Sequence, residues 1–161
     1  MKQLNEQEIL HIAASYSSQA ERCIYDVRKK ITSVGGSSET TERIITHLIK
    51  EKFIDEMRYC RSFVNDKFRF NRWGRIKIAY ELRSKNLDDK LINEAITNIN
   101  EDEYESTLFA LLKDKNRTVK GQTEQDIFAK LYRFALSRGF ESDLTVRQLK
   151  KLKSNNDEEM A

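Results

Sequence analysis

The feature that most constrains the fold of this chain is a 3.6-residue spacing of apolar side chains that continues through nearly the whole sequence. The 161 residues include no proline and only five glycines, so the turn residues on which β-sandwiches and barrels depend are scarce. Sustained alternation of apolar and polar residues, the pattern of a half-buried strand, is almost absent. We therefore predict an all-α protein.

Nine segments carry an apolar stripe that one face of a helix can bury. The stripes lie at residues 9–16, 24–31, 44–49, 57–68, 76–82, 91–99, 104–112, 127–135 and 144–152. Helix starts are indicated by short polar residues that can accept hydrogen bonds from the first amides of a helix. Ser18 with Glu21, and Asn100 with Glu103, have the spacing of capping boxes, and Asp55 is placed to cap the fourth segment.

The segments group into a repeat of about fifty residues, a period typical of helical arrays. The run KNLDDKL at 85–91 aligns with RGFESDL at 138–144, and Gly35 with Gly36 marks a looser first copy. Asn or Gly in this position can adopt the left-handed conformation that closes a helix, and the next apolar residue packs back on that turn. We predict three tandem three-helix repeats, forming an elongated, curved helical array. Their bounds are 1–54, 55–99 and 100–153, followed by a disordered tail at 154–161.

Composition and motifs argue against several classes of protein. No apolar run approaches the roughly 20 residues that span a bilayer, and the N-terminus lacks the apolar core of a signal peptide, so we expect a cytoplasmic protein without membrane contact. Cys23 and Cys60 lack metal-ligand spacing and are expected to be buried. His11 and His47 have no neighbouring Cys or second His, and phosphate-binding glycine loops are absent. We predict no enzyme, no metal and no cofactor, in a chain that is a monomer.

Positive charge concentrates in the middle of the chain. Residues 55–99 carry a net charge of +3, against +1 for residues 1–54 and −1 for residues 100–161. The window KFRFNRWGRIKIAY, residues 67–80, contains five basic residues and no acid. Its side chains can contact phosphates, carboxylates or nucleobases, which predicts a binding site for a partner protein or nucleic acid at Lys67, Arg69, Arg72, Trp73, Arg75 and Lys77.

The alternative is that this window is only a solvated face with two aromatics in the core. The binding interpretation fails if the guanidinium groups of Arg69, Arg72 and Arg75 lie in ion pairs within the chain and face away from any open concavity. For a second basic cluster, at Lys113, Lys115, Arg117 and Lys120, we favour a solvated loop.

The segment from Phe53 to Leu87 resembles the middle of the RecX regulatory proteins. The shared pattern is an apolar residue, one or two acids, an Arg and an aromatic, then a basic stretch before a glycine, a Glu-Leu pair and a Lys-Gly turn. It is carried here by Ile54, Asp55, Glu56, Arg58, Tyr59, Phe63, Val64, Gly74, Ile76, Glu81, Leu82, Lys85 and Leu87. RFALSRGFESDL near the C-terminus and, more faintly, SSQAERCIYDVRKKI near the N-terminus extend the likeness. The chain departs from it at Asn86, where Gly is common, and at Arg22, where Leu is frequent.

This resemblance implies a small helical protein of tandem three-helix repeats that regulates the bacterial recombinase RecA. Such proteins lie in the groove of the RecA filament on single-stranded DNA and restrain its growth, ATP hydrolysis and strand exchange, without enzymatic activity of their own. Within the segment that carries the likeness we add Arg58 and Lys85 to the predicted contact residues. The alternative function is a stand-alone helical module that binds single-stranded or duplex DNA.

Overall fold

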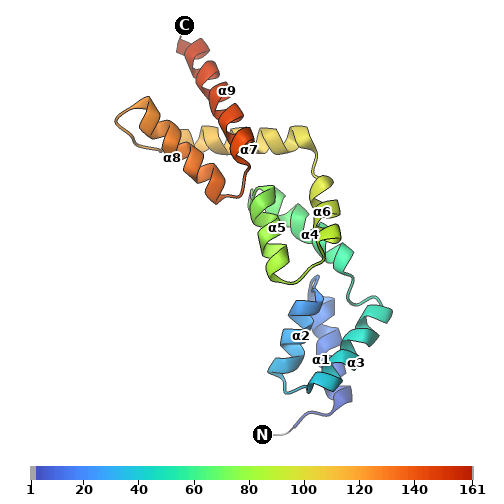
Figure 1. The fold of residues 1–161 in the computed structure, drawn as a ribbon. Helices are drawn as coiled ribbons and strands as arrows, with labels where there is room; N and C mark the ends of the chain where they lie inside the picture. The colour runs from blue at the N-terminus through green and yellow to red at the C-terminus, as the bar shows by residue number, and fades with distance from the viewer. Residues whose placement is uncertain (1–2, 161) are drawn as a thin grey trace. The chain divides into compact units, whose positions relative to one another are not determined.

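The structure, a computed structural model, describes residues 3–160, and this part of the chain forms nine α-helices and no strand (Figure 1). The all-α prediction is confirmed, and each predicted stripe falls on one helix, with Ile99 just past the end of its helix. The bounds are α1 Glu6–Gln19, α2 Ile24–Ser33, α3 Ser38–Lys50, α4 Glu56–Arg69, α5 Arg75–Ser84, α6 Asp89–Thr97, α7 Glu101–Asn116, α8 Glu124–Ser137 and α9 Ser142–Met160.

The chain divides into two compact units. Unit 1 comprises the described residues up to Phe63 together with Leu82–Ala95, and unit 2 comprises Val64–Glu81 together with the described residues from Ile96 onward. Residues 55–99, the predicted middle repeat, therefore contribute to both units. The predicted repeat bounds at 54/55 and 99/100 stay a prediction.

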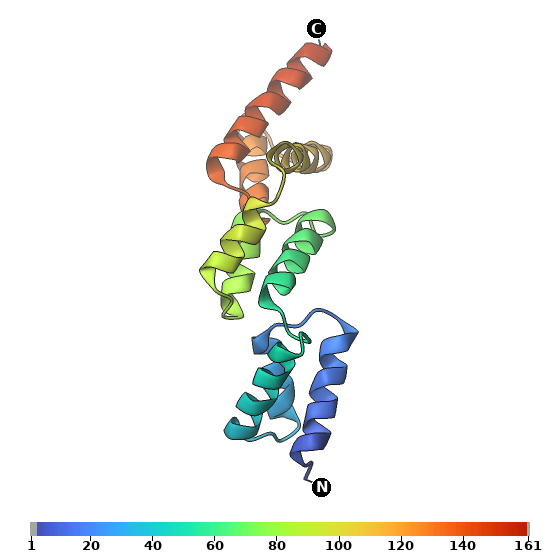
Figure 2. The same ribbon diagram turned by 90° about the vertical axis from the view of Figure 1, so that its right-hand side faces the viewer.

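In unit 1, α1, α2 and α3 lie side by side as a three-helix bundle in both views (Figures 1 and 2). Burying one aliphatic side chain of this size contributes about 1.5–3 kcal/mol, so the shared apolar core is what holds the bundle together. The core side chains are Ile9, Ala13, Val27, Ile31, Ile44, Ile45, Leu48 and Ile54.

The helix starts confirm part of the capping prediction. The Asn100 side chain accepts a hydrogen bond from the Glu103 amide at 2.9 Å, and the Asp55 carboxylate accepts one from the Arg58 amide at 3.0 Å. The predicted box at Ser18 is wrong: the Ser18 hydroxyl donates to the Ala14 carbonyl inside α1. A serine can return its hydroxyl to the preceding turn of a helix as well as cap the next one, and here α1 continues to Gln19.

The turn that suggested a repeat recurs at the ends of α2, α5 and α8. Gly35, Asn86 and Gly139 have φ values of +90°, +62° and +95°, the left-handed conformation that closes a Schellman motif. Each is flanked by the same two backbone hydrogen bonds, of 2.9–3.3 Å. The pairs are Gly35 to Thr32 and Gly36 to Ile31, Asn86 to Arg83 and Leu87 to Leu82, and Gly139 to Leu136 and Phe140 to Ala135.

In unit 2, α7, α8 and α9 pack on one another. The sequence predicts a disordered tail at 154–161. In the structure α9 runs to Met160, and Ala161 lies outside the described residues. Leu144, Leu149 and Leu152 are buried and fix the first three turns of this helix. Once a helix is nucleated, each further residue adds a hydrogen bond at little cost, so the helix continues past the last apolar position.

Candidate functional site

The N-terminus of α5 is held against the loop between α8 and α9 by direct backbone contact. The Gly74 amide donates to the Arg138 carbonyl at 2.7 Å, and the Ile76 amide donates to the Gly139 carbonyl at 3.0 Å. A Cβ atom on Gly74 would lie 2.3 Å from the Gly139 backbone, and one on Gly139 would lie 2.3 Å from the Lys77 Cβ. Both glycines are therefore required for the close approach that positions the basic window.

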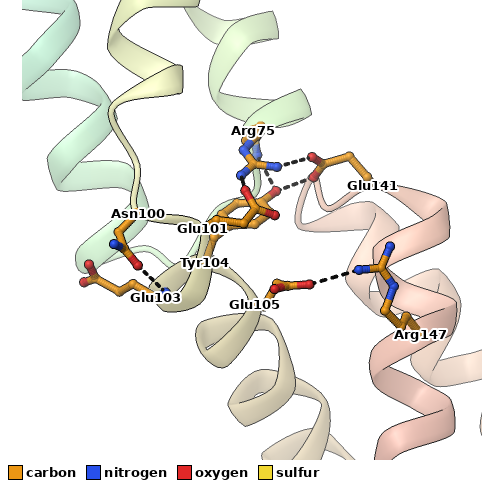
Figure 3. Close-up of polar contacts among 8 residues, drawn as sticks. All are labelled: Arg75, Asn100, Glu101, Glu103, Tyr104, Glu105, Glu141 and Arg147. Carbon is orange, nitrogen blue, oxygen red and sulfur yellow. Dashed lines mark hydrogen bonds and ion pairs between the residues drawn. The ribbon is translucent and has the colours of Figure 1, made fainter.

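Arg75 lies at the centre of a partly buried polar network (Figure 3). Its guanidinium group packs over the Tyr104 ring, 3.8 Å from the centroid, donates to Glu141 at 2.7 Å and pairs with Glu101. The Tyr104 hydroxyl donates to Glu141 and accepts from the Arg75 amide at 2.9 Å. Burial first, and then the hydrogen bond to Glu141, raise the pKa of Tyr104 far above its ordinary value. Arg75 thus joins the start of α5 to α7 and α9.

Arg69 and Arg72 also form ion pairs within unit 2, but more exposed ones. Arg69 lies 3.0 Å from Glu103 and donates to Asn65 at 2.7 Å, and Arg72 lies 3.6 Å from Asp114. About half of each arginine side chain is exposed, against 22% for Arg75. An exposed pair contributes only about 0–1 kcal/mol, so an incoming partner can displace these carboxylates.

All three arginines therefore lie in ion pairs within the chain, which is the first part of the condition under which the binding interpretation fails. The pairing is tightest for Arg75, because its side chain is only 22% exposed and it contacts two carboxylates, those of Glu101 and Glu141. Arg69 and Arg72 stay candidate contacts at reduced strength.

In unit 1, Arg58 and Lys85 hold other helices in place. Arg58 lies 2.6 Å from Glu21, and the Lys85 ammonium contacts Asp26 at 3.0 Å and the Tyr59 hydroxyl at 3.1 Å. Burial lowers the pKa of Lys85, but the bonds to Tyr59 and Asp26 outweigh it and leave that pKa raised. Arg58 thus links α4 to the segment before α2, and Lys85 links the turn after α5 to α2.

The remaining predicted residues, Lys67, Trp73 and Lys77, form a group of their own in unit 2. The Lys67 and Lys77 ammonium groups lie 4.9 Å and 4.4 Å from the centroid of the Trp73 ring, within the range of cation–π attraction. Ile76, Lys77 and Tyr80 share one face of α5, and Ile76 and Tyr80 are 56% and 68% exposed. Trp73 lies two residues before the start of this helix. We call these five residues the α5 surface.

Sequence analysis missed the exposure of Ile76 and Tyr80, which it assigned to the buried stripe of the fifth segment. In the structure Ile78, Ala79 and Leu82 take that place. The signal was present, because apolar residues at 76, 78, 79, 80 and 82 extend around more than one face of a ten-residue helix. Phe70, in the loop before α5, is 80% exposed as well.

The cysteines behave as expected from their lack of motif spacing. Cys23 and Cys60 are buried and free of disulfide bonds, and burial raises the pKa of each thiol to about 11. Between residues 3 and 160, no three His, Cys, Asp or Glu side chains lie close enough to bind a metal ion. Over the same residues no helix combines the length and apolar character that crossing a membrane requires.

Comparison with known proteins decides the family. Residues 55–96 match the family model described as RecX, second three-helix domain. The regulatory protein RecX of Prosthecochloris aestuarii is 31% identical over 151 residues, covering 92% of this chain and 95% of the relative. The chain belongs to the RecX family of regulatory proteins. The resemblance found in the sequence is confirmed.

Other RecX proteins differ in length. The regulatory protein RecX of Clostridium tetani is 32% identical over 126 residues, which are 77% of this chain but only 56% of that relative. A crystal structure of RecX from Lactobacillus salivarius superposes with a TM-score of 0.82 at 20% identity, over 92% of this chain and 96% of the other. This superposition shows that the fold is shared.

The stretch matched by the RecX model contains Gly74 and all five residues of the α5 surface. It overlaps the predicted middle repeat, residues 55–99.

Proposed function

We propose that this protein binds the RecA recombinase filament on single-stranded DNA and restrains its ATP hydrolysis, extension and strand exchange. The observation that carries the proposal is family membership over nearly the full length of a protein named regulatory protein RecX. The role is one of binding, without chemistry of its own. It is therefore a regulator that acts by occupying the filament.

The α5 surface is the contact region that the side-chain geometry supports best. Trp73 offers an aromatic face, Lys67 and Lys77 lie beside it, and Ile76 and Tyr80 add apolar area that the chain's own core leaves exposed. Buried aromatic anchors with flanking cations supply most of the binding energy in protein interfaces. Arg69 and Arg72 add weaker contacts by exchanging Glu103 and Asp114 for partner groups.

Regulation then follows from differential binding. The protein stabilises the filament state that its surface fits best, and the shift cannot exceed the difference in its affinity for the two states. A filament presents many equivalent subunits, so a few bound copies can restrain a long stretch.

The test uses the purified full chain with RecA, ATP and single-stranded DNA. We expect ATP hydrolysis to fall at a concentration of the protein well below that of RecA, and the protein to co-sediment with the filament. Unchanged hydrolysis with the protein in excess overturns the proposal.

A second function, binding to DNA without RecA, is favoured by the same exposed aromatics, since bases stack on such side chains beside cationic groups. Titration of labelled single-stranded and duplex DNA separates the two. Tight binding whose logarithmic salt slope is about −4 to −5 on duplex DNA, the value for about five phosphate contacts, favours the stand-alone module. Weak binding to free DNA together with tight binding to the filament favours the RecA regulator.

A further inference from the structure

Unit 2 contains an apolar groove that lies outside the α5 surface. It has a volume of about 780 Å³ and is lined by α8, α9 and the end of α7. Its floor is aliphatic and aromatic, and its rim is polar. The floor residues are Ile127, Phe128, Leu131, Leu149 and Leu152, and the rim residues are Asn116, Glu124, Gln125, Lys153, Asn156 and Asp157.

The spacing of these residues fits a helix as the occupant. Both lining helices present positions i, i+3, i+4 and i+7 to the groove, which form a ridge along one face of a helix. A third helix can place its own apolar ridge between two such ridges, the mode by which many grooves bind amphipathic peptides. The positions are 124, 127, 128 and 131 on α8, and 149, 152, 153 and 156 on α9.

Acids in and beside the groove favour a basic helix as the occupant. Asp157 lines the groove, Glu158 and Glu159 follow it in α9, and the last turn of this helix, as far as the structure describes it, has no basic residue. The C-terminus of a helix already bears partial negative charge, so acids there are unfavourable until a cation approaches. Lys153 lies 3.7 Å from Glu124 across the groove, so the one cation on the rim already faces an acid of α8.

We propose that this groove binds a basic amphipathic helix of a partner protein. Its apolar face would lie on Phe128 and Leu131, and its cations would meet the acids at the end of α9. The basic helix α2 of a second copy of this chain cannot be the occupant, because its apolar face is buried in the core of unit 1 through Val27 and Ile31.

The first experiment uses a labelled 14-residue peptide of leucine and lysine in amphipathic order, about 21 Å long as a helix, and the full chain without RecA or DNA. The matched peptide has every lysine replaced by glutamate. We expect saturable binding of the lysine peptide by fluorescence anisotropy, at least about tenfold tighter than the glutamate peptide. Equal binding of the two peptides, or no saturable binding of either, overturns the proposal.

Two variants locate the binding. Phe128→Gln changes a side chain that is already 38% exposed and should weaken lysine-peptide binding by about tenfold, as expected for an anchor residue. Tyr80→Gln, on the α5 surface, is the matched control and should leave that binding unchanged. If Phe128→Gln binds like the wild type, the groove is not the site.

The triple substitution Asp157→Lys, Glu158→Lys and Glu159→Lys tests the charge argument. It places cations at a helix C-terminus, where they favour the helix, so weaker peptide binding cannot come from unfolding. We expect the lysine peptide to bind less tightly and the glutamate peptide to bind more tightly. Because RecA is absent, these results do not depend on the proposed RecA function.

Discussion

Trp73 and Arg75 are two residues apart in a single basic window, yet the structure uses them in opposite ways. Arg75 is mostly buried and bonded to Glu101 and Glu141, so carboxylates of unit 2 itself neutralise its charge. Trp73 lies just before α5, with the Lys77 ammonium over its ring. The inward residue fixes the position of α5, and the outward one is available to a partner.

The difference shows why a count of basic residues does not identify a binding surface. The acids that pair with Arg75 lie 26 and 66 residues further along the chain, and only the fold brings them together. An arginine matches a carboxylate with a planar fork of donors, whereas a lysine has a single mobile ammonium group. In this window all three arginines pair with carboxylates, and the ammonium groups of Lys67 and Lys77 lie 4.9 Å and 4.4 Å from the centroid of the Trp73 ring.

The largest expected loss of stability comes from the backbone contact between the N-terminus of α5 and Gly139 in the loop between α8 and α9. Gly139→Ala places a Cβ 2.3 Å from the Lys77 Cβ at a φ of +95°, and should lower the free energy of unfolding by about 3 kcal/mol. Gly35→Ala is the control, since its φ is +90° but nothing lies within 4 Å, and should cost about 1 kcal/mol. Urea denaturation measures both, and equal losses would show that the contact is not tight.

The polar network should come next. Tyr104→Phe removes a hydroxyl that serves both Glu141 and the Arg75 amide, and unsatisfied buried groups cost about 1–3 kcal/mol. Tyr132→Phe removes a hydroxyl bonded to Ser142 at an exposed position and should cost less than about 0.5 kcal/mol. Thermal denaturation measures the melting temperatures of both variants. If both equal that of the wild type, the Tyr104 network does not stabilise the fold.

The exposed arginines should matter less. Arg69→Ala with Arg72→Ala removes two half-exposed ion pairs, and should lower the free energy of unfolding by no more than about 1 kcal/mol. Raising the salt concentration should reduce even that loss, because salt screens exposed charges. If the free energy of unfolding falls as much as in Tyr104→Phe, then Arg69 and Arg72 stabilise the fold in the way that Arg75 does.

The smallest effect concerns a buried acid that lacks a full set of partners. Burial raises the pKa of Glu56 above its ordinary value of 4.5, and one of its carboxylate oxygens is buried without a hydrogen bond. Its charged form is therefore disfavoured in the folded state, and that penalty is present at pH 7 and disappears as the pH falls through 4.5. Because the group is only half-buried, Glu56→Gln should stabilise the protein by a few tenths of a kcal/mol at pH 7.

Denaturation of this variant and the wild type should therefore give different midpoints at pH 7 and the same midpoint at pH 4. A gain that is unchanged at pH 4 would assign the effect to packing.

Much of the fold could be predicted because it depends on local patterns. The apolar stripes located the helices, and the Lys-Asn-Leu and Arg-Gly-Phe turns located the left-handed residues Asn86 and Gly139. The Ser18 cap failed because a hydroxyl has two backbone partners within reach, and the sequence does not say which it takes. The tail was predicted disordered because an apolar period is needed to pack a helix but not to extend one.

The candidate site was harder to predict because it depends on which face of α5 the fold covers. Ile76 and Ile78 are indistinguishable as letters in a sequence, yet one is 56% exposed and the other is fully buried. Lys67, Trp73 and Lys77 were predicted as contact residues from the basic window, whereas Ile76 and Tyr80 became candidates only once the packed face of α5 was known.

The most direct test of the account measures RecA-dependent ATP hydrolysis on single-stranded DNA with the double variant Lys77→Ala and Tyr80→Ala. Alanine at 77 keeps the Cβ that meets Gly139, so unfolding by urea should be unchanged. We expect that about tenfold more of this variant than of the wild type is needed for the same inhibition. The variant Arg69→Ala with Arg72→Ala should inhibit nearly as well as the wild type. Full inhibition by the Lys77 and Tyr80 variant, with inhibition lost in the arginine variant, would contradict this expectation.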